Sequence, residues 1–265
     1  MCRPASMVVT KQKVFWSKNS DSHEDIIEEF KLDEGKLREQ PKLVRVEIVP
    51  PNEDYKLPFS KWNYRLDQDI KPKWYDEKKV EARVRKHLKE WRKCKVVMPN
   101  EEKREIKTGN IVAIYGTVKY IRGGTVEYID GGIVEYIDGG TVEYIYGGTV
   151  EYMRGGTVEC IRGGTVEYIY GGTVKYIHGG TVKYIDGGTV KYIRGGTVKY
   201  IRGGTVECIY GGTVKYIDGK LPSELKGSVL ITTYKHLSPK ILKSSQAVMI
   251  DRSGAKVKCY VGRDE

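Results

Sequence analysis

Residues 139–146 read Gly-Gly-Thr-Val-Glu-Tyr-Ile-Tyr, and the chain between residues 116 and 219 repeats this eight-residue phrase almost without change. Thirteen copies follow one another with no insertion, and their third position falls at Thr117, at Thr125 and at every eighth residue up to Thr213. A strict period of this kind is typical of a solenoid, in which successive repeats stack on one another. The repeat therefore predicts an architecture, although it supplies no reactive group.

Each phrase combines a strand with a turn. Thr-Val-Glu/Lys-Tyr-Ile is strongly strand-forming, and Gly-Gly adopts the positive φ values that reverse a chain sharply. Antiparallel hairpins would leave neither face of the sheet apolar, whereas parallel stacking gives continuous rows of Val, Tyr and Ile. We therefore predict a mainly β protein built on a parallel β-solenoid.

The variable eighth position of the phrase tests how many phrases make one coil. With one phrase per coil, Asp130 would stack on Asp138, about 4.8 Å away. Arg154 would likewise stack on Arg162. Coils of two phrases and coils of three phrases both avoid these like-charge contacts. We favour two repeats per coil, a coil of sixteen residues, because two facing strands would then pair Val with Tyr; three repeats per coil is the alternative.

The phrase leaves open which side chains face inward. Strict alternation places Val and Tyr together, and on that basis we expect a repeat core formed by Val126, Tyr128, Val142, Tyr144, Val166, Tyr168, Val190 and Tyr192. In the rival arrangement the strand bends before Ile, which turns Ile inward and leaves a ladder of Tyr outside. The fifth position is Glu in residues 127–167 and mostly Lys afterwards, so the two halves of the array differ in charge.

The array separates two other segments. Residues 1–108 show a hairpin pattern at 7–16, a helix start at Ser22, alternating strands at 42–49 and 62–66, and a helix from Asp76. They predict a small α+β head that caps the array. We assign residues 109–219 to the solenoid and 220–265 to degenerate coils that form a C-terminal cap.

Several short segments carry a resemblance to known proteins. Residues 1–2, 8–10, 14–16, 21–26, 46–50 and 72–75 are similar to an uncharacterised family of phage and prophage proteins. Members of that family pair such an N-terminal domain with octapeptides phrased Asn-Ala-Thr-Val-Glu-Ala-Tyr, close to Gly-Thr-Val-Glu-Tyr-Ile here. The resemblance implies a phage or mobile-element origin and gives no catalytic residue to carry over.

Catalytic and metal-binding patterns are weak. Removal of Met1 would expose Cys2 as an N-terminal nucleophile that His23 and Asp25 could support. Arg3-Pro4 departs from the small-residue turn that such enzymes show, so we favour an incidental Cys. His87 is interpreted as a boundary residue of a charged helix. The four His and five Cys show no metal-ligand spacing, and no phosphate-binding loop is present, so we expect no metal and no cofactor.

The balance of charge makes acidic partners plausible. The formal net charge is +11 and the pI about 9.2. The helix within 76–95 is rich in Lys and Arg, which could contact phosphate groups, although a solvated helix face is the commoner explanation and the one we favour. The candidate nucleic-acid contacts on it are Lys79, Arg83, Arg85, Lys86 and Arg92.

Five scattered Cys, no long apolar run and no secretory signal favour the phage or host cytosol, without a membrane. The leading hypothesis is a non-enzymatic structural or binding protein that presents a repetitive surface to another protein or to itself. Nucleic-acid binding through the basic helix and the Lys-rich later coils is the alternative. Ice binding and catalysis by Cys2 rank lower, the former because Glu or Lys interrupts each potential Thr-x-Thr row.

Overall fold

The computed structural model describes residues 4–36, 39–218, 224–225, 229–233, 240, 242 and 246–263. The chain divides into two compact units. Unit 1 comprises residues 1–96 with 109–112, and unit 2 comprises residues 97–108 with 113–265. The division shows that the first turn of the array begins near residue 97, before the octapeptides start.

Unit 1 is built on a four-stranded antiparallel sheet with the order β2-β1-β5-β6. Its strands are β1 (Ser6–Thr10), β2 (Val14–Phe15), β5 (Leu43–Val49) and β6 (Asn63–Leu66). A separate pair consists of β3 (Gly35–Lys36) and β4 (Gln40–Pro41), and two short 3-10 turns span Pro51–Glu53 and Phe59–Lys61. The alternating strands predicted in the first hundred residues are thus present in one sheet.

Three helices accompany this sheet: α1 (His23–Glu29), α2 (Glu77–Arg85) and α3 (Leu88–Lys95). Ser22 caps α1 and Asp76 caps α2, each with a side-chain oxygen that accepts a backbone N–H of the first turn. The single helix expected from Asp76 is split, because the His87 N–H bonds to the Val84 carbonyl three residues earlier and tightens the chain there. The apolar stripe continues across the break, since Val80, Val84, Leu88 and Trp91 are all buried.

A buried ion pair lies beneath α3 in unit 1. The Lys95 ammonium is 2.9 Å from a carboxylate oxygen of Asp21, and both side chains are almost fully shielded from solvent. The Trp91 indole N–H donates to the other Asp21 oxygen at 3.0 Å. The Asn110 side-chain amide donates to the oxygen that faces Lys95, at 3.4 Å. Three groups therefore compensate the burial of this carboxylate, as a charge in an apolar interior requires.

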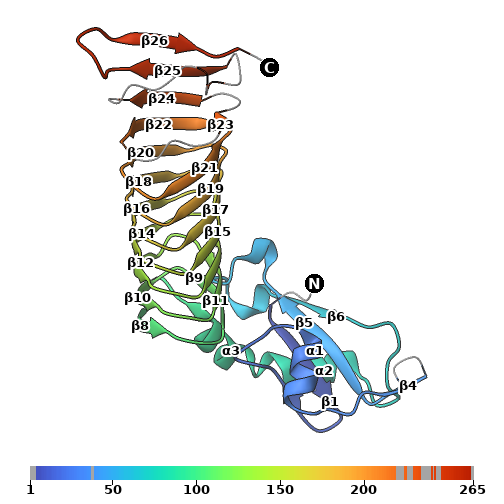
Figure 1. The fold of residues 1–265 in the computed structure, drawn as a ribbon. Coiled ribbons are helices and arrows are strands. Elements are labelled where there is room, and N and C mark those ends of the chain that lie inside the picture. Colours follow the sequence, from blue (N-terminus) through green and yellow to red (C-terminus); the bar gives the residue numbers. More distant parts are fainter. Residues whose placement is uncertain are drawn as a thin grey trace. The chain divides into compact units, whose positions relative to one another are not determined.

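Unit 2 is a parallel β-solenoid whose coils alternate between two sheets (Figure 1). The eleven-stranded sheet contains β8 (Glu102–Ile106), β10 (Thr117–Ile121), β12 (Ile133–Ile137), β14 (Thr149–Met153), β16 (Thr165–Ile169), β18 (Thr181–Ile185), β20 (Thr197–Ile201), β22 (Gly212–Ile217), β24 (Val229–Thr233), β25 (Ala247–Asp251) and β26 (Lys258–Val261). The nine-stranded sheet contains β7 (Val96–Val97), β9 (Asn110–Ile114), β11 (Thr125–Ile129), β13 (Thr141–Ile145), β15 (Thr157–Ile161), β17 (Thr173–Ile177), β19 (Thr189–Ile193), β21 (Thr205–Ile209) and β23 (Glu224–Leu225).

The strand register fixes the coil at two octapeptides. Thr141 pairs with Thr157 and Val142 with Val158, in each case two repeats further along the chain, and the same offset holds from β10 to β22. The predicted coil of two octapeptides is confirmed, and the alternative of three is excluded. Like residues therefore stack on like residues in both sheets.

The prediction that Val and Tyr both face inward is correct for Val and wrong for Tyr. Val142 and Ile145 are fully buried, whereas Tyr144 lies half-buried on the outer surface. The paired register runs through Val142 and Tyr144 but omits Glu143, so the strand bends at this residue and breaks the alternation. The bend turns both Glu143 and Tyr144 outward and returns Ile145 to the core, as in the rival arrangement.

The Gly-Gly corners depend on the absence of a side chain. Gly172 has a φ of +76°, and a Cβ atom there would lie 2.6 Å from the Gly156 carbonyl oxygen of the preceding coil. Both the backbone conformation and the close approach of stacked turns require glycine at this position. The corners are thus part of what holds neighbouring coils at strand spacing.

The last described strands depart from the octapeptide. β24 stacks in parallel on β22 with a register shift, and β25 stacks in parallel on β24. β26 then pairs antiparallel with β25 and is the terminal strand of the eleven-stranded sheet. The predicted break at 220–223 lies outside the described residues. β24, β25 and β26 lie within the residues assigned to the C-terminal cap, and their pairing does not follow the register of the octapeptides.

Candidate binding surface

One outer face of the array carries an uninterrupted column of aromatic rings. It lies on the eleven-stranded sheet, where the sixth position of each octapeptide supplies one tyrosine per strand. We call this column the tyrosine ladder, and it consists of Tyr120, Tyr136, Tyr152, Tyr168, Tyr184, Tyr200 and Tyr216.

The rings of the tyrosine ladder are stacked along the axis of the array. Neighbouring ring centroids lie 4.7–5.4 Å apart, and their planes are within 6–16° of each other. Neighbouring strands of a parallel sheet lie about 4.8 Å apart. Each ring is attached at the equivalent position of its strand, so the strand spacing sets the distance between rings. Burial in the stack raises the pKa of the Tyr152 hydroxyl.

The nine-stranded sheet has no equivalent column among its described residues. Cys160 replaces tyrosine between Tyr144 and Tyr176, and Cys208 replaces it after Tyr192. Stacked pairs remain, such as Tyr176 on Tyr192 at 5.3 Å. The two outer faces therefore differ chemically although they arise from the same repeat, because a coil of two octapeptides sends alternate copies to opposite sheets.

Beside the tyrosine ladder runs a row formed by the eighth position of the octapeptide. We call it the variable row, and it consists of Arg122, Asp138, Arg154, Tyr170, Asp186, Arg202 and Asp218. Arg154 is hydrogen-bonded to Asp138 at 2.7 Å, and Arg202 is hydrogen-bonded to Asp186 at the same distance. These bonds raise the pKa of both guanidinium groups. The row thus holds one hydrogen-bonded Arg–Asp pair on each side of Tyr170. We call these two the matched ion pairs.

Each of these arginines also covers a ring of the ladder. The Arg154 guanidinium lies 4.3 Å from the centre of the Tyr136 ring, and that of Arg202 lies 4.3 Å from the centre of Tyr184. A cation over an aromatic face is attracted by the ring quadrupole. The arginines are consequently held by two contacts each, and the face they form is ordered although it is about half exposed.

The fifth position forms a second charged row on the same face. We call it the charged row, and it consists of Lys119, Glu135, Glu151, Glu167, Lys183, Lys199 and Lys215. Its sign changes twice, between Lys119 and Glu135 and between Glu167 and Lys183, and an ion pair forms at each change. The hydrogen bond from Lys183 to Glu167 raises the pKa of the ammonium group.

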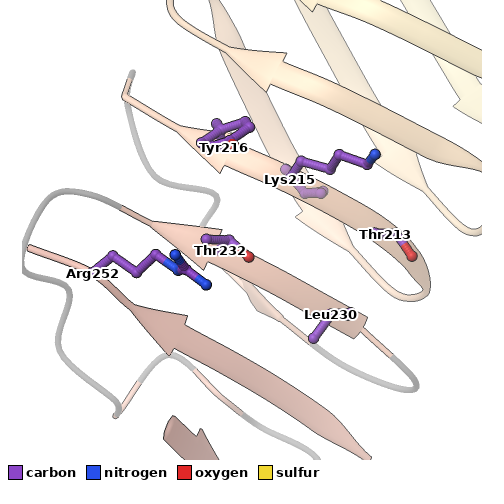
Figure 2. Close-up of a pocket in the computed structure, with 7 residues that line it drawn as sticks. Thr213, Lys215, Tyr216, Leu230, Thr232 and Arg252 are labelled. Atoms are coloured by element: carbon purple, nitrogen blue, oxygen red, sulfur yellow. The ribbon is translucent and has the colours of Figure 1, made fainter. Parts of the chain in front are cut away.

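The ladder face ends in a hollow of about 320 Å³ between β22 and β24. Figure 2 shows Lys215 and Tyr216 on one strand, Leu230 and Thr232 on the next, and Arg252 beside them. The hollow arises at the register shift, because Thr232 stands where the octapeptide has two residues. Ladder and hollow together form one continuous outer surface with aromatic, basic and hydroxyl groups.

The structure separates the residues expected in the repeat core into two sets. Val126, Val142, Val166 and Val190 are fully buried between the sheets. Tyr128, Tyr144, Tyr168 and Tyr192 are half-buried on the outer faces, which corrects their expected position. Of these, only Tyr168 belongs to the tyrosine ladder. The sequence did not predict the tyrosine ladder, because the tyrosine position of the octapeptide was expected to face the core.

Three of the five candidate nucleic-acid contacts in unit 1 are engaged within the protein. Arg83 donates to the carbonyl oxygen of Thr10 at 3.1 Å. Arg85 binds Glu81 and the carbonyl oxygens of Phe59 and Trp62. Arg92 lies 4.0 Å above the Phe59 ring.

The two lysines of that set are closer to solvent. Lys79 forms an exposed ion pair with Asp76, its helix cap, at 3.4 Å. Lys86 ends α2 and lines a hollow of about 370 Å³ together with Lys13 and His87. The three arginines therefore hold unit 1 together, whereas Lys79 and Lys86 are exposed.

The candidate catalytic group is divided between described and undescribed residues. Cys2 lies outside the described residues. His23 is fully buried, with Nε2 3.1 Å from the Val46 carbonyl oxygen and Nδ1 3.2 Å from a carboxylate oxygen of Asp67. Both ring nitrogens of His23 thus have partners within unit 1.

Metal ligands do not cluster in the part of the chain that the structure describes: no three His, Cys, Asp or Glu side chains there are placed to share an ion. Within the same residues, no helix has the length and apolarity needed to span a membrane. Unit 1 does contain a cavity of about 460 Å³, lined by Lys11, Glu39, Gln40, Pro41, Lys42, Lys71, Pro72, Lys73 and Trp74.

Comparison with known proteins gave no relative. No protein-family model, no curated protein and no solved structure matches the chain significantly. The fold and surface define the class, a parallel β-solenoid with a small α+β unit. The phage or prophage origin remains an expectation from the resemblance.

Proposed function

We propose that this chain is a non-enzymatic structural or binding protein that works through the ladder face, meaning the tyrosine ladder with its charged and variable rows. The observation that carries the proposal is the continuity of the ladder over seven strands. Aromatic and Arg side chains held in place are the groups that protein interfaces favour. The partner is another protein or a second copy of this chain.

Order along the face supports a binding role. Backbone hydrogen bonds repeat from coil to coil, as between the Thr165 N–H and the Gly148 carbonyl and between the Thr181 N–H and the Gly164 carbonyl, both at 2.9 Å. Ring stacking and the paired contacts of each arginine hold the side chains of the face on this backbone, so they lose little conformational freedom on binding. The resemblance to phage and prophage proteins leads us to infer an origin in a phage or mobile element, and action in the phage or host cytosol.

A photo-crosslinking experiment tests this function. Benzoylphenylalanine replaces Tyr152 on the ladder face and, as the matched control, Tyr144 on the nine-stranded sheet. Both side chains are half-buried outer tyrosines of the same repeat position. We expect irradiation, in the purified protein or in a bacterial lysate, to give discrete adducts from position 152 and few from position 144. Absence of adducts from position 152 under both conditions contradicts the proposal.

Nucleic-acid binding is the second candidate, and the lysine-lined cavity of unit 1 favours it. Lys11, Lys42, Lys71 and Lys73 border this cavity beside Trp74. An aromatic ring next to clustered ammonium groups suits a stacked base with its phosphate. Lys79 and Lys86 of the basic helix and the Lys-rich later coils, such as Lys191 and Lys199, would add phosphate contacts.

Retention on immobilised single-stranded DNA across a salt series tests this candidate, because phosphate binding weakens steeply with salt. Lys71→Glu with Lys73→Glu removes the cavity charges, and Lys191→Glu with Lys199→Glu is the matched change in the array. If the cavity binds nucleic acid, the first pair of substitutions lowers the salt concentration needed for elution much more than the second. Equal, small effects exclude the cavity as the binding site.

A further inference from the structure

The variable row reverses its charge about its own midpoint. Counted outward from Tyr170, Arg154 has its counterpart in Asp186, and Asp138 has its counterpart in Arg202. The outermost residues, Arg122 and Asp218, continue the pattern. Every charge in the row is thus matched by the opposite charge at the same distance on the other side of Tyr170.

Such a row is complementary to its own reverse, and this points to a second copy of the chain. We infer that two copies associate through their ladder faces as an antiparallel dimer, about a two-fold axis that runs along β16 beside Tyr170. A two-fold axis parallel to the strands places each row over the same row of the partner, in reverse order. The inference rests on the proposed function of the ladder face and names its partner.

The matched ion pairs are the principal contacts of this arrangement. The Arg154–Asp138 pair would face the partner's Arg202–Asp186 pair with its polarity reversed. Four charges of alternating sign then form a closed ring, and the two-fold axis generates a second ring. Because each pair keeps its intrachain bond, no guanidinium or carboxylate has to be buried without a partner.

The centre of the row fits the axis as well. Tyr170 is the aromatic member of the variable row, with 48 % of its surface accessible, and it stacks on Tyr168 of the ladder. At the axis it would meet the partner's Tyr170, so the largest apolar side chain of the row would be covered. Central aromatic residues surrounded by polar contacts are typical of stable interfaces.

The charged row agrees with the same axis at four of its seven positions. Glu135 would face the partner's Lys199, and Glu151 would face the partner's Lys183. Lys119 and Lys215 would face each other as like charges at the two ends. Glu167 would meet the partner's Glu167 at the axis, where each is already bound by Lys183 of its own chain.

An axis shifted by half a coil, between β16 and β18, suits the charged row better and the variable row worse. It would pair Glu167 with the partner's Lys183, but it would also place Arg154 over the partner's Arg202. Asp138 would likewise face the partner's Asp218. The axis at Tyr170 therefore gives the larger number of opposite-charge contacts.

The size of the face is sufficient for a dimer. Seven strands at about 4.8 Å and five residues with the adjoining eighth position cover about 34 Å by about 20 Å. Burial of this face in both copies removes roughly 1,350 Å² from solvent, which lies within the range of specific interfaces.

The test reverses one ion pair and then both. Asp186→Arg with Arg202→Asp keeps the net charge and the intrachain pair, but it turns both rings of charge into like-charge contacts. Adding Asp138→Arg with Arg154→Asp restores the alternation. Glu159→Lys with Lys175→Glu, an ion pair of 2.7 Å on the nine-stranded sheet, is the matched control. Sedimentation equilibrium and thermal unfolding are measured for each protein.

We expect the wild type and the control to sediment at twice 30.1 kDa, and the double variant (Asp186→Arg with Arg202→Asp) to dimerise at least tenfold more weakly. The quadruple variant, which also carries Asp138→Arg and Arg154→Asp, should regain the dimer. The quadruple variant carries more like-charge neighbours within the chain than the double variant, so its recovery cannot reflect better folding.

A monomeric wild type, or a dimer that persists in the double variant, overturns the inference. A quadruple variant that stays monomeric while still folded also overturns it. If crosslinks from position 152 then join other proteins in the lysate, the proposed function stands with a different partner. If position 152 gives no adduct at all, the proposed function fails together with the dimer.

Discussion

Tyr168 stacks on Tyr184, two repeats further along the chain, with ring centroids 4.8 Å apart and planes 9° apart. The intervening tyrosine, Tyr176, belongs to the opposite sheet and stacks on Tyr192. This relationship follows from the coil of two octapeptides, because consecutive copies of the repeat are sent to opposite faces. It also gives each face its own composition, which a single repeated phrase would not lead one to expect.

The first prediction contrasts an inward and an outward residue of one strand. Ile185→Lys places a charge in the fully buried core, and we expect it to unfold the neighbouring coils. Tyr184→Lys changes a half-buried outer residue and should lower the free energy of unfolding by only about 1 kcal/mol through lost stacking. Circular dichroism and hydrogen exchange across β16–β20 measure both. Equal losses would contradict the orientation of the strand.

The corner glycines give a second prediction. Gly172 and Gly131 both have positive φ, but a Cβ atom would meet the preceding turn only at Gly172. Gly131→Ala should therefore cost about 1–2 kcal/mol from backbone strain alone. Gly172→Ala adds a collision with backbone atoms and should cost about 3 kcal/mol or more. Chemical denaturation distinguishes the two, and a Gly131→Ala variant that is the less stable would contradict the stacked-corner geometry.

The buried ion pair of unit 1 gives a third prediction. Lys95→Met removes the ammonium group that compensates Asp21 and leaves a buried carboxylate with neutral donors only. We expect a loss of about 3 kcal/mol. Lys93→Met, an exposed residue of the same helix, is the control and should change the stability by less than about 0.5 kcal/mol. Similar melting temperatures for the two variants would show that Asp21 does not depend on Lys95.

Glu143 provides a fourth prediction, which involves pH. Desolvation and the neighbouring Glu159 raise the pKa of the Glu143 carboxyl. The folded state therefore binds this proton more tightly than the unfolded state, and the group destabilises the fold as pH rises through the folded pKa. Glu143→Lys, which would alternate with Glu159 and Glu127, should stabilise the array at pH 7 by about 0.5–1 kcal/mol.

Glu143→Gln is the control for this substitution, because it relieves repulsion without adding an opposite charge. Its stability at pH 7 should lie between those of the wild type and Glu143→Lys. The advantage of Glu143→Lys over the wild type should shrink as pH falls through the pKa of the carboxyl. A Glu143→Lys protein that melts below the wild type at pH 7 would show that repulsion among Glu127, Glu143 and Glu159 does not destabilise the array.

The charges at the eighth position excluded a coil of one octapeptide but were consistent with coils of two or three. The preference for two rested on a pairing of Val with Tyr in the core, which the structure does not show, so the strand register was needed to fix the coil length. Asp138 and Arg154 are two repeats apart, and they do form an ion pair. The helix caps at Ser22 and Asp76 could be predicted from the sequence, because capping depends only on residues close together in the chain. The break at His87 could not, because the apolar stripe of Val84, Leu88 and Trp91 continues across it.

The orientation of the tyrosines was mispredicted because alternation was counted through a residue where the strand bends. A usable signal was present in the substitutions of the repeat. Cys160 and Cys208 stand at tyrosine positions, and exchange of a large ring for a small thiol would leave a cavity in a close-packed core. Tolerance of that exchange indicates an outer position. The variable row, by contrast, can be written from the sequence as soon as two octapeptides are taken to form one coil.

The native Cys160 allows a direct measurement of the central claim, which is that two octapeptides form one coil with the tyrosine position outside. With the remaining cysteines replaced by serine, Tyr176→Cys, Tyr168→Cys and Tyr184→Cys place a second thiol two, one and three repeats away, respectively. Cys160 and Tyr176 are register partners on adjacent strands, within the Cα separation that a disulfide requires. Oxidation followed by mass spectrometry should give an intrachain disulfide in Tyr176→Cys alone. A disulfide in Tyr168→Cys or Tyr184→Cys, with none in Tyr176→Cys, would contradict the two-octapeptide coil.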